Sequence, residues 1–329
     1  MQLTPVTTAR LGEHLPLLDL LPDQNPITWV RNGEGLVGWG CYARKKVSGP
    51  NRFQEARNWW HEQLDKFDIN NPVHLPGTGP LLFTSFSFNP DEESELVIPE
   101  VIVGMRGNKS WITWIGDKPQ PRIQSSLTNI QPPKINWVDN STDLWREKVN
   151  LAISEIQKGR LDKVVLAREI IGHGESEIDP RFVLRNLANE YPATWVYSNN
   201  GLVGATPELL LRLSKSMVVS RILAGTISKT GDDDKDLALA ASLARSSKDL
   251  EEHEYAVRSV ADALSPFCSS TNVPDSPFVL HLANVMHLAT DVSGAISESH
   301  NVVDLFALIE KLHPSAAVCG TPTEIAGAV

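Results

Sequence analysis

The order of strand-like and helix-like segments constrains the fold of this chain most strongly. Short β-branched or alternating runs dominate it, and only a few long helical patterns interrupt them. The predicted strands cover residues 81–88, 101–105, 111–115, 163–171, 195–198, 209–213 and 217–222. Because strands and helices do not alternate regularly, this order favours an α+β fold over a doubly wound parallel sheet.

Three patterns are specific enough to predict elements with their ends. Residues 101–105 and 111–115 flank a turn at 106–109 and predict a β-hairpin. Apolar residues at the 3.6-residue period predict a helix that begins at Ser141 or Asp143 and stops at Gly159. A second helical pattern carries Ala256 and Val260, and an apolar segment follows it at 278–292.

Composition divides the chain into parts. Between Asp117 and Asn140, Pro, Gln, Ser and Asn largely replace apolar residues, which predicts a surface connector. We therefore expect an N-terminal β-rich lobe at 1–118, a connector at 119–140 and a catalytic region at 141–329.

The last residues resemble the start of a helix. Thr321, Pro322 and Glu324 supply a capping residue, a proline at the first helical position and a glutamate at the third. Stable helices usually need about ten residues or more, and fewer remain. We therefore expect a chain truncated at its C-terminus.

Charge and cysteine usage exclude several classes of function. A formal net charge of −10, without a Lys- or Arg-rich block, disfavours nucleic acid and anionic lipid as partners. No apolar run is long enough to span a membrane, and the first residues lack a signal-peptide pattern. Cys41, Cys268 and Cys319 are too far apart for a disulfide framework or zinc motif and are expected to be reduced core thiols. We expect a soluble cytoplasmic monomer or weak homodimer.

Two side chains could exchange protons with a substrate. Lys163 begins an apolar strand, where it would share a face with Val165 and Ala167, and partial burial would lower its pKa toward that of a general base. Glu208 precedes an apolar strand, where burial would raise its pKa and keep it protonated as a general acid. Taken alone, a solvated edge lysine and an ordinary turn glutamate are the commoner interpretations.

Glu252 is a candidate metal ligand. It shares a helical face with Ala256 and Val260, and a carboxylate on an apolar face needs a partner. Mg²⁺ is one such partner, and an Arg or Lys side chain is the other. His253 is not expected to share the metal, because neighbouring residues on a helix point about 100° apart.

Two further segments could contact an anionic substrate. Residues 223–226 form a small-residue turn after a predicted strand, where bare backbone N–H groups could approach an anionic carboxylate, although most such turns are only turns. His287 lies within an apolar strand, where a histidine of the core is commoner than a catalytic one.

Together, and in this order, these segments resemble the chorismate-utilising enzymes, which include anthranilate, aminodeoxychorismate, salicylate and isochorismate synthases. Residues 86–90 are the best match in the N-terminal half. The stronger matches are 163–168 (KVVLAR), 204–210 (GATPELL), 223–226 (LAGT), 248–253 (KDLEEH), 284–288 (NVMHL) and 313–322 (HPSAAVCGTP). The resemblance implies an α+β fold with mostly antiparallel sheets packed between helical layers and a site in a cleft.

The resemblance also implies the type of reaction. Members that install an amino group usually have glutamine where Lys163 stands, and the aminodeoxychorismate type has lysine where Ala224 stands. The inverted pattern found here is similar to isochorismate synthases, which are isomerases that convert chorismate to isochorismate for menaquinone or siderophore biosynthesis.

Particular roles follow from that resemblance. Lys163 would be the base for a water that attacks C2, and Glu208 the acid for the departing C4 hydroxyl. Mg²⁺ on Glu252 would neutralise the C1 carboxylate. The implied substrate contacts are at Gly225, Thr226, His287 and Ala317.

Two alternatives remain open at this point. A salicylate synthase would make the same intermediate and then eliminate pyruvate, although residues 313–317 look more like the isochorismate type. An inactive chorismate-binding pseudoenzyme is the second alternative, because the family normally continues with a second magnesium-binding glutamate and further cations.

Overall fold

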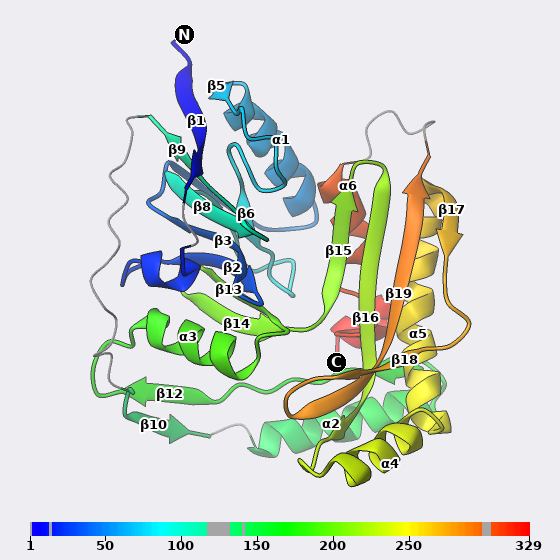
Figure 1. The fold of residues 1–329 in the computed structure, drawn as a ribbon. Coiled ribbons are helices and arrows are strands. Elements are labelled where there is room, and N and C mark those ends of the chain that lie inside the picture. Colours follow the sequence, from blue (N-terminus) through cyan, green and yellow to red (C-terminus); the bar gives the residue numbers. More distant parts are fainter. Residues whose placement is uncertain (1, 13–14, 117–131, 140–141, 298–303) are drawn as a thin grey trace. The chain divides into compact units, whose positions relative to one another are not determined.

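The computed structural model describes residues 2–12, 15–116, 132–139, 142–297 and 304–329. The chain forms two compact units (Figure 1). Unit 1 comprises Met1–Lys134 and Gly174–Pro207, and unit 2 comprises Ile135–His173 and Glu208–Val329.

This division differs from the predicted continuous region at 141–329. Residues 174–207 join unit 1 because β13 (Trp195–Asn199) pairs antiparallel with β2 (Ile27–Arg31). Cross-strand pairing between segments so far apart leaves no local sequence signal. Of the predicted connector, 119–131 and 140 lie outside the described residues, and the described part includes β10 (Ile135–Val138).

Unit 1 is built on an eight-stranded sheet within its described residues. The strand order is β14-β13-β2-β3-β8-β9-β1-β5, in which β1 and β5 are parallel and the other neighbours are antiparallel. The remaining strands of this sheet are β1 (Thr4–Leu11), β3 (Glu34–Trp39), β5 (Phe67–Asn70), β8 (Val101–Arg106), β9 (Lys109–Ile115) and β14 (Leu202–Thr206). The predicted hairpin is confirmed as β8 and β9, which pair from Val101↔Trp114 to Arg106↔Lys109.

The core of unit 1 lies between that sheet and its helices. Leu17–Leu20 forms a short 3-10 helix, and Leu21, Val37, Val103 and Leu184 are among the buried residues that pack together. The other elements of the unit are α1 (Arg52–Leu64), α3 (Pro180–Glu190) and the sheet of β4 (Ala43–Val47), β7 (Ser94–Ile98) and β6 (Phe83–Ser85). The strand predicted at 81–88 is therefore shorter than expected.

One cysteine departs from its prediction. Cys319 is buried and Cys268 is half-buried, but Cys41 is exposed. Cys41 lies in the connection between β3 and β4 and is exposed there, so the prediction of a core thiol was wrong for this residue.

Unit 2 centres on two twelve-residue antiparallel strands, β16 (Met217–Ser228) and β19 (Val285–Ile296). The sheet in the described part of this unit has the order β15-β16-β19-β17, and β18 also pairs with β19. Its other strands are β15 (Leu209–Ser214), β17 (Cys268–Asn272) and β18 (Phe278–His281). Most neighbours in both large sheets are thus antiparallel, as expected for an α+β fold.

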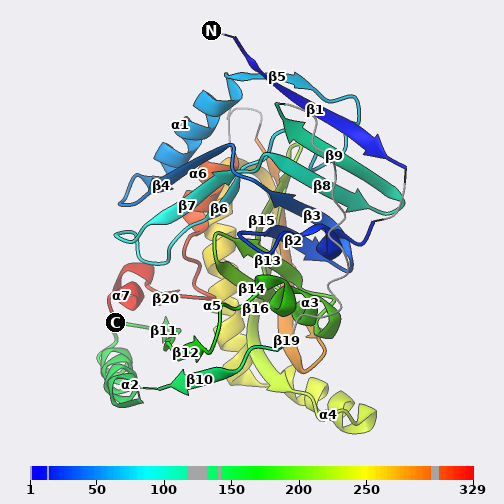
Figure 2. The same ribbon diagram turned by 90° about the vertical axis from the view of Figure 1, so that its left-hand side faces the viewer.

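Helices cover this sheet and form the second core. Apolar residues recur along α5 (Ser247–Leu264), and Ala256, Val260 and Leu264 pack with Val218 and Val292 of the sheet. The other helices are α2 (Thr142–Gln157), α4 (Asp233–Leu243), α6 (Leu305–Leu312) and α7 (Thr323–Gly327), and a 3-10 turn spans Ser265–Phe267. Figure 2 shows α5 running along β16 and β19.

The strand predicted at 163–171 was wrong as one element. The structure contains β11 (Lys163–Val164), which pairs with β20 (Gly320–Thr321), and β12 (Ile171–Gly174), which pairs with β10. Residues 165–170 are not in a strand, because the partners at the two ends are different. Val165 and Ala167 are exposed and do not share a buried face with Lys163.

The helix start near the C-terminus was placed almost correctly. α7 begins at Thr323, with Pro322 as its N-cap and no capping bond from a side chain. Pro322 therefore precedes the first helical position instead of occupying it. Leu161, Cys319 and Ala326 form a small buried cluster beside β11 and β20.

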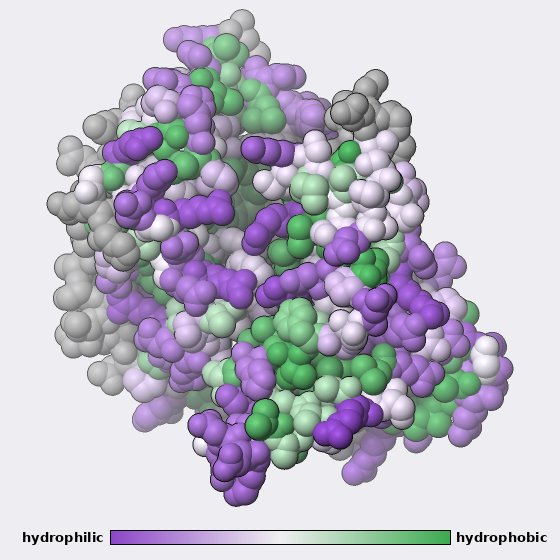
Figure 3. Space-filling view, turned by 45° about the vertical axis from the view of Figure 1, so that its right-hand side comes forward, coloured by the Kyte–Doolittle hydropathy of each residue, from purple (hydrophilic) through white to green (hydrophobic). Residues whose placement is uncertain are grey.

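None of the helices in the described ranges is both long and apolar enough to cross a membrane. Figure 3 shows hydrophilic side chains spread over one face, with smaller hydrophobic patches between them.

Gly320 permits the close approach of β20 to β11. Its φ is +151°, and a Cβ added there would lie 2.2 Å from the carbonyl oxygen of Lys163. We expect Gly320→Ala to lower the free energy of unfolding by roughly 1 to 3 kcal/mol through clash and backbone strain, measured by urea denaturation. Gly12→Ala is the matched control, because nothing lies within 4 Å of an added Cβ there. Equal stability of the two variants would contradict this account of Gly320.

Candidate active site

Lys163 is buried at the start of β11, where it is 8% exposed. Its Nζ donates a hydrogen bond to the carbonyl oxygen of Ala316 at 2.9 Å and lies 3.7 Å from Oε1 of Glu252. Pairing of Lys163 with Thr321 in β20 holds the backbone beside the segment that contains Ala316. Within the described residues, the amine thus has a backbone carbonyl as its hydrogen-bond acceptor and the Glu252 carboxylate as its ion-pair partner.

Burial lowers the pKa of Lys163 below its usual value of 10.5. The negative charges of Glu252 and then Glu208 raise it, but desolvation is the larger effect. A buried amine with a lowered pKa is the state that a general base requires.

Glu208 lies between β14 and β15, at the first residue of unit 2's second segment. Burial raises the pKa of this carboxyl to about 7, against the opposing effects of a backbone hydrogen bond from Leu223 and the charge of Lys163. A carboxyl group that keeps its proton near neutral pH can act as a general acid. Lys163 and Glu208 are close enough for each to influence the pKa of the other.

Lys163 and Glu252 also line one cavity of about 320 Å³. This volume is within the range of small-molecule sites, roughly 300 to 1,000 Å³. The other lining residues are Ile156, Asp162, Val164, Lys248, Glu251 and Tyr255. Glu208 is not one of the described residues that line it.

A β-bulge brings three of the predicted substrate contacts together. The register of β16 and β19 shifts between Ala224 and Thr226, and Gly225 at the bulge has a φ of +80°. Thr226 then pairs with His287, and Thr226 Oγ1 lies 2.9 Å from His287 Nδ1. Burial lowers the pKa of His287, while a hydrogen bond to the backbone of Gly225 raises it.

Gly225 is also confined by helix α5. A Cβ added to it would lie 3.1 Å from the Cβ of Asp249 and 3.3 Å from a methyl group of Leu288. The bulge, the first turn of α5 and β19 therefore meet at this glycine.

Ala317 has a different environment from the other predicted contacts. It packs, half-buried, against the core cluster that includes Val218 and Leu308. Its neighbour Ala316 is the residue whose carbonyl accepts the hydrogen bond from Lys163. Sequence reasoning found this segment through the block at 313–322, but it did not identify a backbone carbonyl as the contact.

His253 is the residue of this region that sequence reasoning set aside. It is 3% exposed, and its ring nitrogens lie 3.2 Å from the carbonyl oxygen of Ala224 and 2.8 Å from Oγ1 of Thr290. Both nitrogens therefore contact protein groups.

The chemistry of the acidic side chains fits a magnesium ion in part. Mg²⁺ takes oxygen ligands and usually binds through one or two carboxylates plus water. Glu252 is half-buried at the cavity, and Asp162 and Glu251 also line it. Within the described residues no three His, Cys, Asp or Glu side chains lie close enough to form a complete metal site. Carboxylates of the type that Mg²⁺ prefers therefore line the cavity, and Glu252 is the one among them that lies 3.7 Å from the amine of Lys163.

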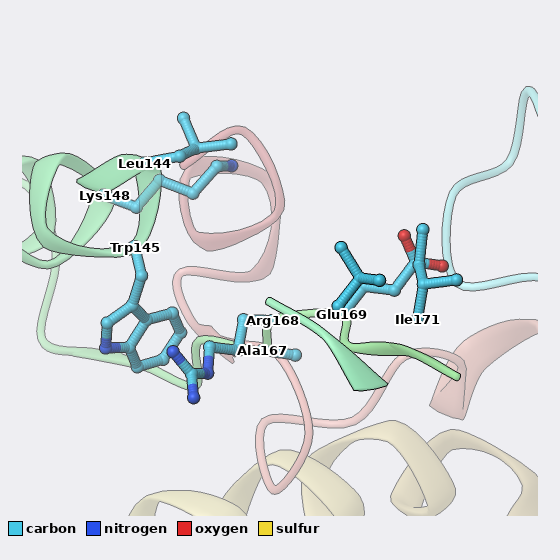
Figure 4. A pocket seen from close by; sticks show the side chains of 8 residues that line it. Leu144, Trp145, Lys148, Ala167, Arg168, Glu169 and Ile171 are labelled. Carbon is cyan, nitrogen blue, oxygen red and sulfur yellow. The ribbon is translucent and has the colours of Figure 1, made fainter. Parts of the chain in front are cut away.

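A second cavity, of about 300 Å³, has a different character. Figure 4 shows Leu144, Trp145 and Lys148 on α2 and the other labelled side chains on the segment 167–171 opposite. Its walls contain none of the candidate acid, base or metal-binding residues. Lys163 and Glu252 line the other cavity, which therefore remains the candidate site of this unit.

Comparison with known proteins adds to this geometry. The family model described as "Chorismate binding enzyme" matches residues 22–329. The chain belongs to the chorismate-binding enzyme family. It is 29% identical over 326 residues to the isochorismate synthase MenF of Bacillus subtilis, an alignment that covers 88% of this chain and 68% of that protein.

Two further relatives agree. The isochorismate synthase DhbC of Bacillus subtilis is 30% identical over 263 residues, covering 75% of this chain and 62% of that one. The solved structure of MenF, the menaquinone-specific isochorismate synthase from Escherichia coli, superposes with a TM-score of 0.75 at 22% identity and covers 98% of this chain and 76% of that one. The chain thus spans about two thirds of the length of the relatives that it matches in sequence.

These comparisons confirm two of the predictions. The resemblance to the isochorismate synthases within the chorismate-binding family is confirmed, and the relatives support an enzyme of this type. The α+β fold is confirmed by the mixed helices and antiparallel sheets and by the superposition with MenF.

The raised pKa of Glu208 makes stability depend on pH. The folded state holds this proton up to about pH 7, whereas an unfolded glutamate loses it near 4.5. The contribution of Glu208 to the free energy of unfolding is therefore fully present below the pKa of the glutamate in the unfolded chain. It is lost as the pH rises toward 7, by up to about 1.4 kcal/mol per pH unit.

We expect Glu208→Gln to remove this contribution, so that its free energy of unfolding falls less between pH 5 and 8 than that of the parent. Urea denaturation at each pH measures it. Glu62→Gln, at an exposed position on α1, is the matched control and should follow the parent. The same pH dependence in Glu208→Gln and the parent would refute the assignment.

Proposed function

We propose that this chain converts chorismate to isochorismate, adding water at C2 of the ring and releasing the C4 hydroxyl. The proposal rests above all on a buried lysine whose pKa is lowered and a buried carboxyl whose pKa is raised to about 7, with each influencing the pKa of the other. These two residues suit the two proton transfers of the reaction. The isochorismate synthases among the relatives support the same reaction.

Lys163 is the proposed base. In its neutral form the amine removes a proton from the attacking water and becomes an ammonium ion, which Ala316 and Glu252 stabilise. The carbonyl of Ala316 also fixes the direction of the side chain, so that the amine does not need to reorient.

Glu208 is the proposed acid. It donates its proton to the C4 hydroxyl as the C4–O bond breaks, so that one water enters the ring at C2 and one water leaves from C4. The site begins with a neutral amine and a neutral acid and ends with an ammonium and a carboxylate. The attraction between these two charges therefore grows as the reaction proceeds, while the net charge of the two residues stays the same.

A magnesium ion, when bound, supplies a positive charge that neutralises a substrate carboxylate. Glu252 is the residue that would hold it. The cavity also contains Lys248, and this cation matters because a chain with a net charge of −10 repels an anion at long range. Gly225, Thr226, His287 and Ala317 are the proposed substrate contacts.

The wider setting follows from the same proposal. The isochorismate enters menaquinone or siderophore biosynthesis, and the protein works in the cytoplasm as a monomer or weak homodimer. Chorismate is the proposed binding partner, and the proposal includes neither a nucleic acid nor a membrane.

Product analysis tests the reaction. The purified chain is incubated with chorismate and Mg²⁺, and the products are separated by liquid chromatography. Isochorismate without salicylate or pyruvate is expected. Salicylate with pyruvate would instead identify a salicylate synthase, and chorismate binding by calorimetry without any product would identify a pseudoenzyme; either outcome contradicts the proposal.

Lys163→Ala tests the base. We expect kcat to fall by about 10²- to 10⁴-fold, the usual contribution of a general base, while the dissociation constant for chorismate stays close to that of the parent. Lys158→Ala, at an exposed lysine that pairs with Glu155, is the control and should retain full activity. Near-normal turnover of Lys163→Ala would exclude the lysine as the base.

A further inference from the structure

His253 connects three elements around the candidate site. It lies on α5 directly after Glu252, its Nδ1 faces the carbonyl of Ala224 on β16, and its Nε2 faces the hydroxyl of Thr290 on β19. Ala224 is the last residue before the bulge at Gly225. One imidazole thus contacts the helix, both central strands and the residue beside the bulge.

These contacts define the tautomer of the ring. A backbone carbonyl can only accept, so Nδ1 carries the proton and donates to Ala224, and Nε2 accepts from the hydroxyl of Thr290. His253 and Thr290 are 3% and 2% exposed, so both bonds lie out of water.

The position of His253 on the helix sets the direction of Glu252. Neighbouring residues on an α-helix are separated by about 100°, so a helix that cannot rotate at His253 cannot rotate at Glu252. The carboxylate of Glu252 lies 3.7 Å from the amine of Lys163, a distance that depends on the rotation of α5 about its axis. The close contact of Asp249 with Gly225 limits the same helix one turn earlier.

An apolar residue could fill this space, because Ala256, Val257 and Val260 continue the buried face of α5. Apolar contacts are not directional, whereas two hydrogen bonds from opposite sides of a ring allow one orientation. A buried polar pair also costs stability if either partner is left unpaired. The presence of the buried pair of His253 and Thr290 is best explained by a role in orienting α5.

We propose that His253, held by Thr290, is a positioning residue that orients Glu252 toward Lys163. The proposal deepens the function proposed above and rests on it, since Glu252 is there the residue that holds the magnesium ion. His253 itself touches neither metal nor substrate.

The titration of Lys163 tests this without any measurement of activity. The ¹³Cε resonance of Lys163 in lysine-labelled protein, assigned by its loss in Lys163→Arg, reports the pKa of the amine. The charge of Glu252 raises that pKa, so Glu252→Gln should lower it and serves as the reference. We expect Thr290→Val, which keeps the shape of the side chain and removes the hydroxyl, to shift it in the same direction.

Histidine variants complete the series. His253→Leu loses both bonds, and His253→Asn can still donate to Ala224, so the shift in the pKa of Lys163 should be larger for leucine than for asparagine. His281→Asn, at an exposed position on β18, is the matched control and should leave the resonance unchanged. If His253→Leu does not fold, Thr290→Val and His253→Asn still decide the question.

Kinetics provide a second measurement. Residues that orient a metal ligand usually change metal affinity or activity by about 10- to 100-fold when they are removed, so Thr290→Val should raise the Mg²⁺ concentration for half-maximal turnover by about tenfold and change the KM for chorismate little. A loss of thermal stability without either effect would assign His253 to packing.

The two proposals fail separately. An unchanged pKa of Lys163 in Thr290→Val and His253→Asn, while Glu252→Gln lowers it, would overturn the positioning role. An unchanged pKa in Glu252→Gln would overturn it too, because Glu252 would then not face the amine. Absence of isochorismate from the parent would refute the proposed function and leave the titration result standing.

Discussion

The burial of the Lys163 amine is the constraint on which the candidate site in unit 2 depends. Taking an ammonium out of water is costly, and the structure offsets this with the carbonyl of Ala316 and the carboxylate of Glu252. Those groups come from segments about 150 and 90 residues away in sequence, so the site exists only when β11, β20 and α5 are in place. Gly320 is part of the same requirement, because a side chain there would collide with the carbonyl of Lys163.

The frame around this lysine is one long antiparallel pair with one irregularity. β16 and β19 pair along nearly their whole lengths, and the register shifts only around Gly225 within the described strands. A bulge bends a strand and re-aims its side chains, which here brings Thr226 beside His287. α5 packs on both strands, so the apolar contacts that stabilise the unit also define where Glu252 points.

The electrostatics of the site follow from the same packing. Burial lowers the pKa of Lys163 and raises that of Glu208, so it favours the neutral form of each residue. The attraction between an ammonium and a carboxylate opposes this effect, because it favours the charged forms. Desolvation is the larger effect for each residue. A buried amine whose pKa is lowered, near a buried acid whose pKa is raised, suits the two proton transfers of the proposed reaction.

The sequence by itself determined the fold class, the family and the segments that contain the candidate acid, base and metal ligand. The hairpin at β8 and β9 and the helix α2 were predictable because their signals are local periodicity and turn residues. Tertiary structure alone decided that residues 163–171 form two short strands with different partners, that 174–207 join unit 1 and that His253 contacts Ala224 and Thr290. The physical reason is that strand pairing and buried hydrogen bonds join residues far apart in the chain, and their energies depend on distances that no local pattern records.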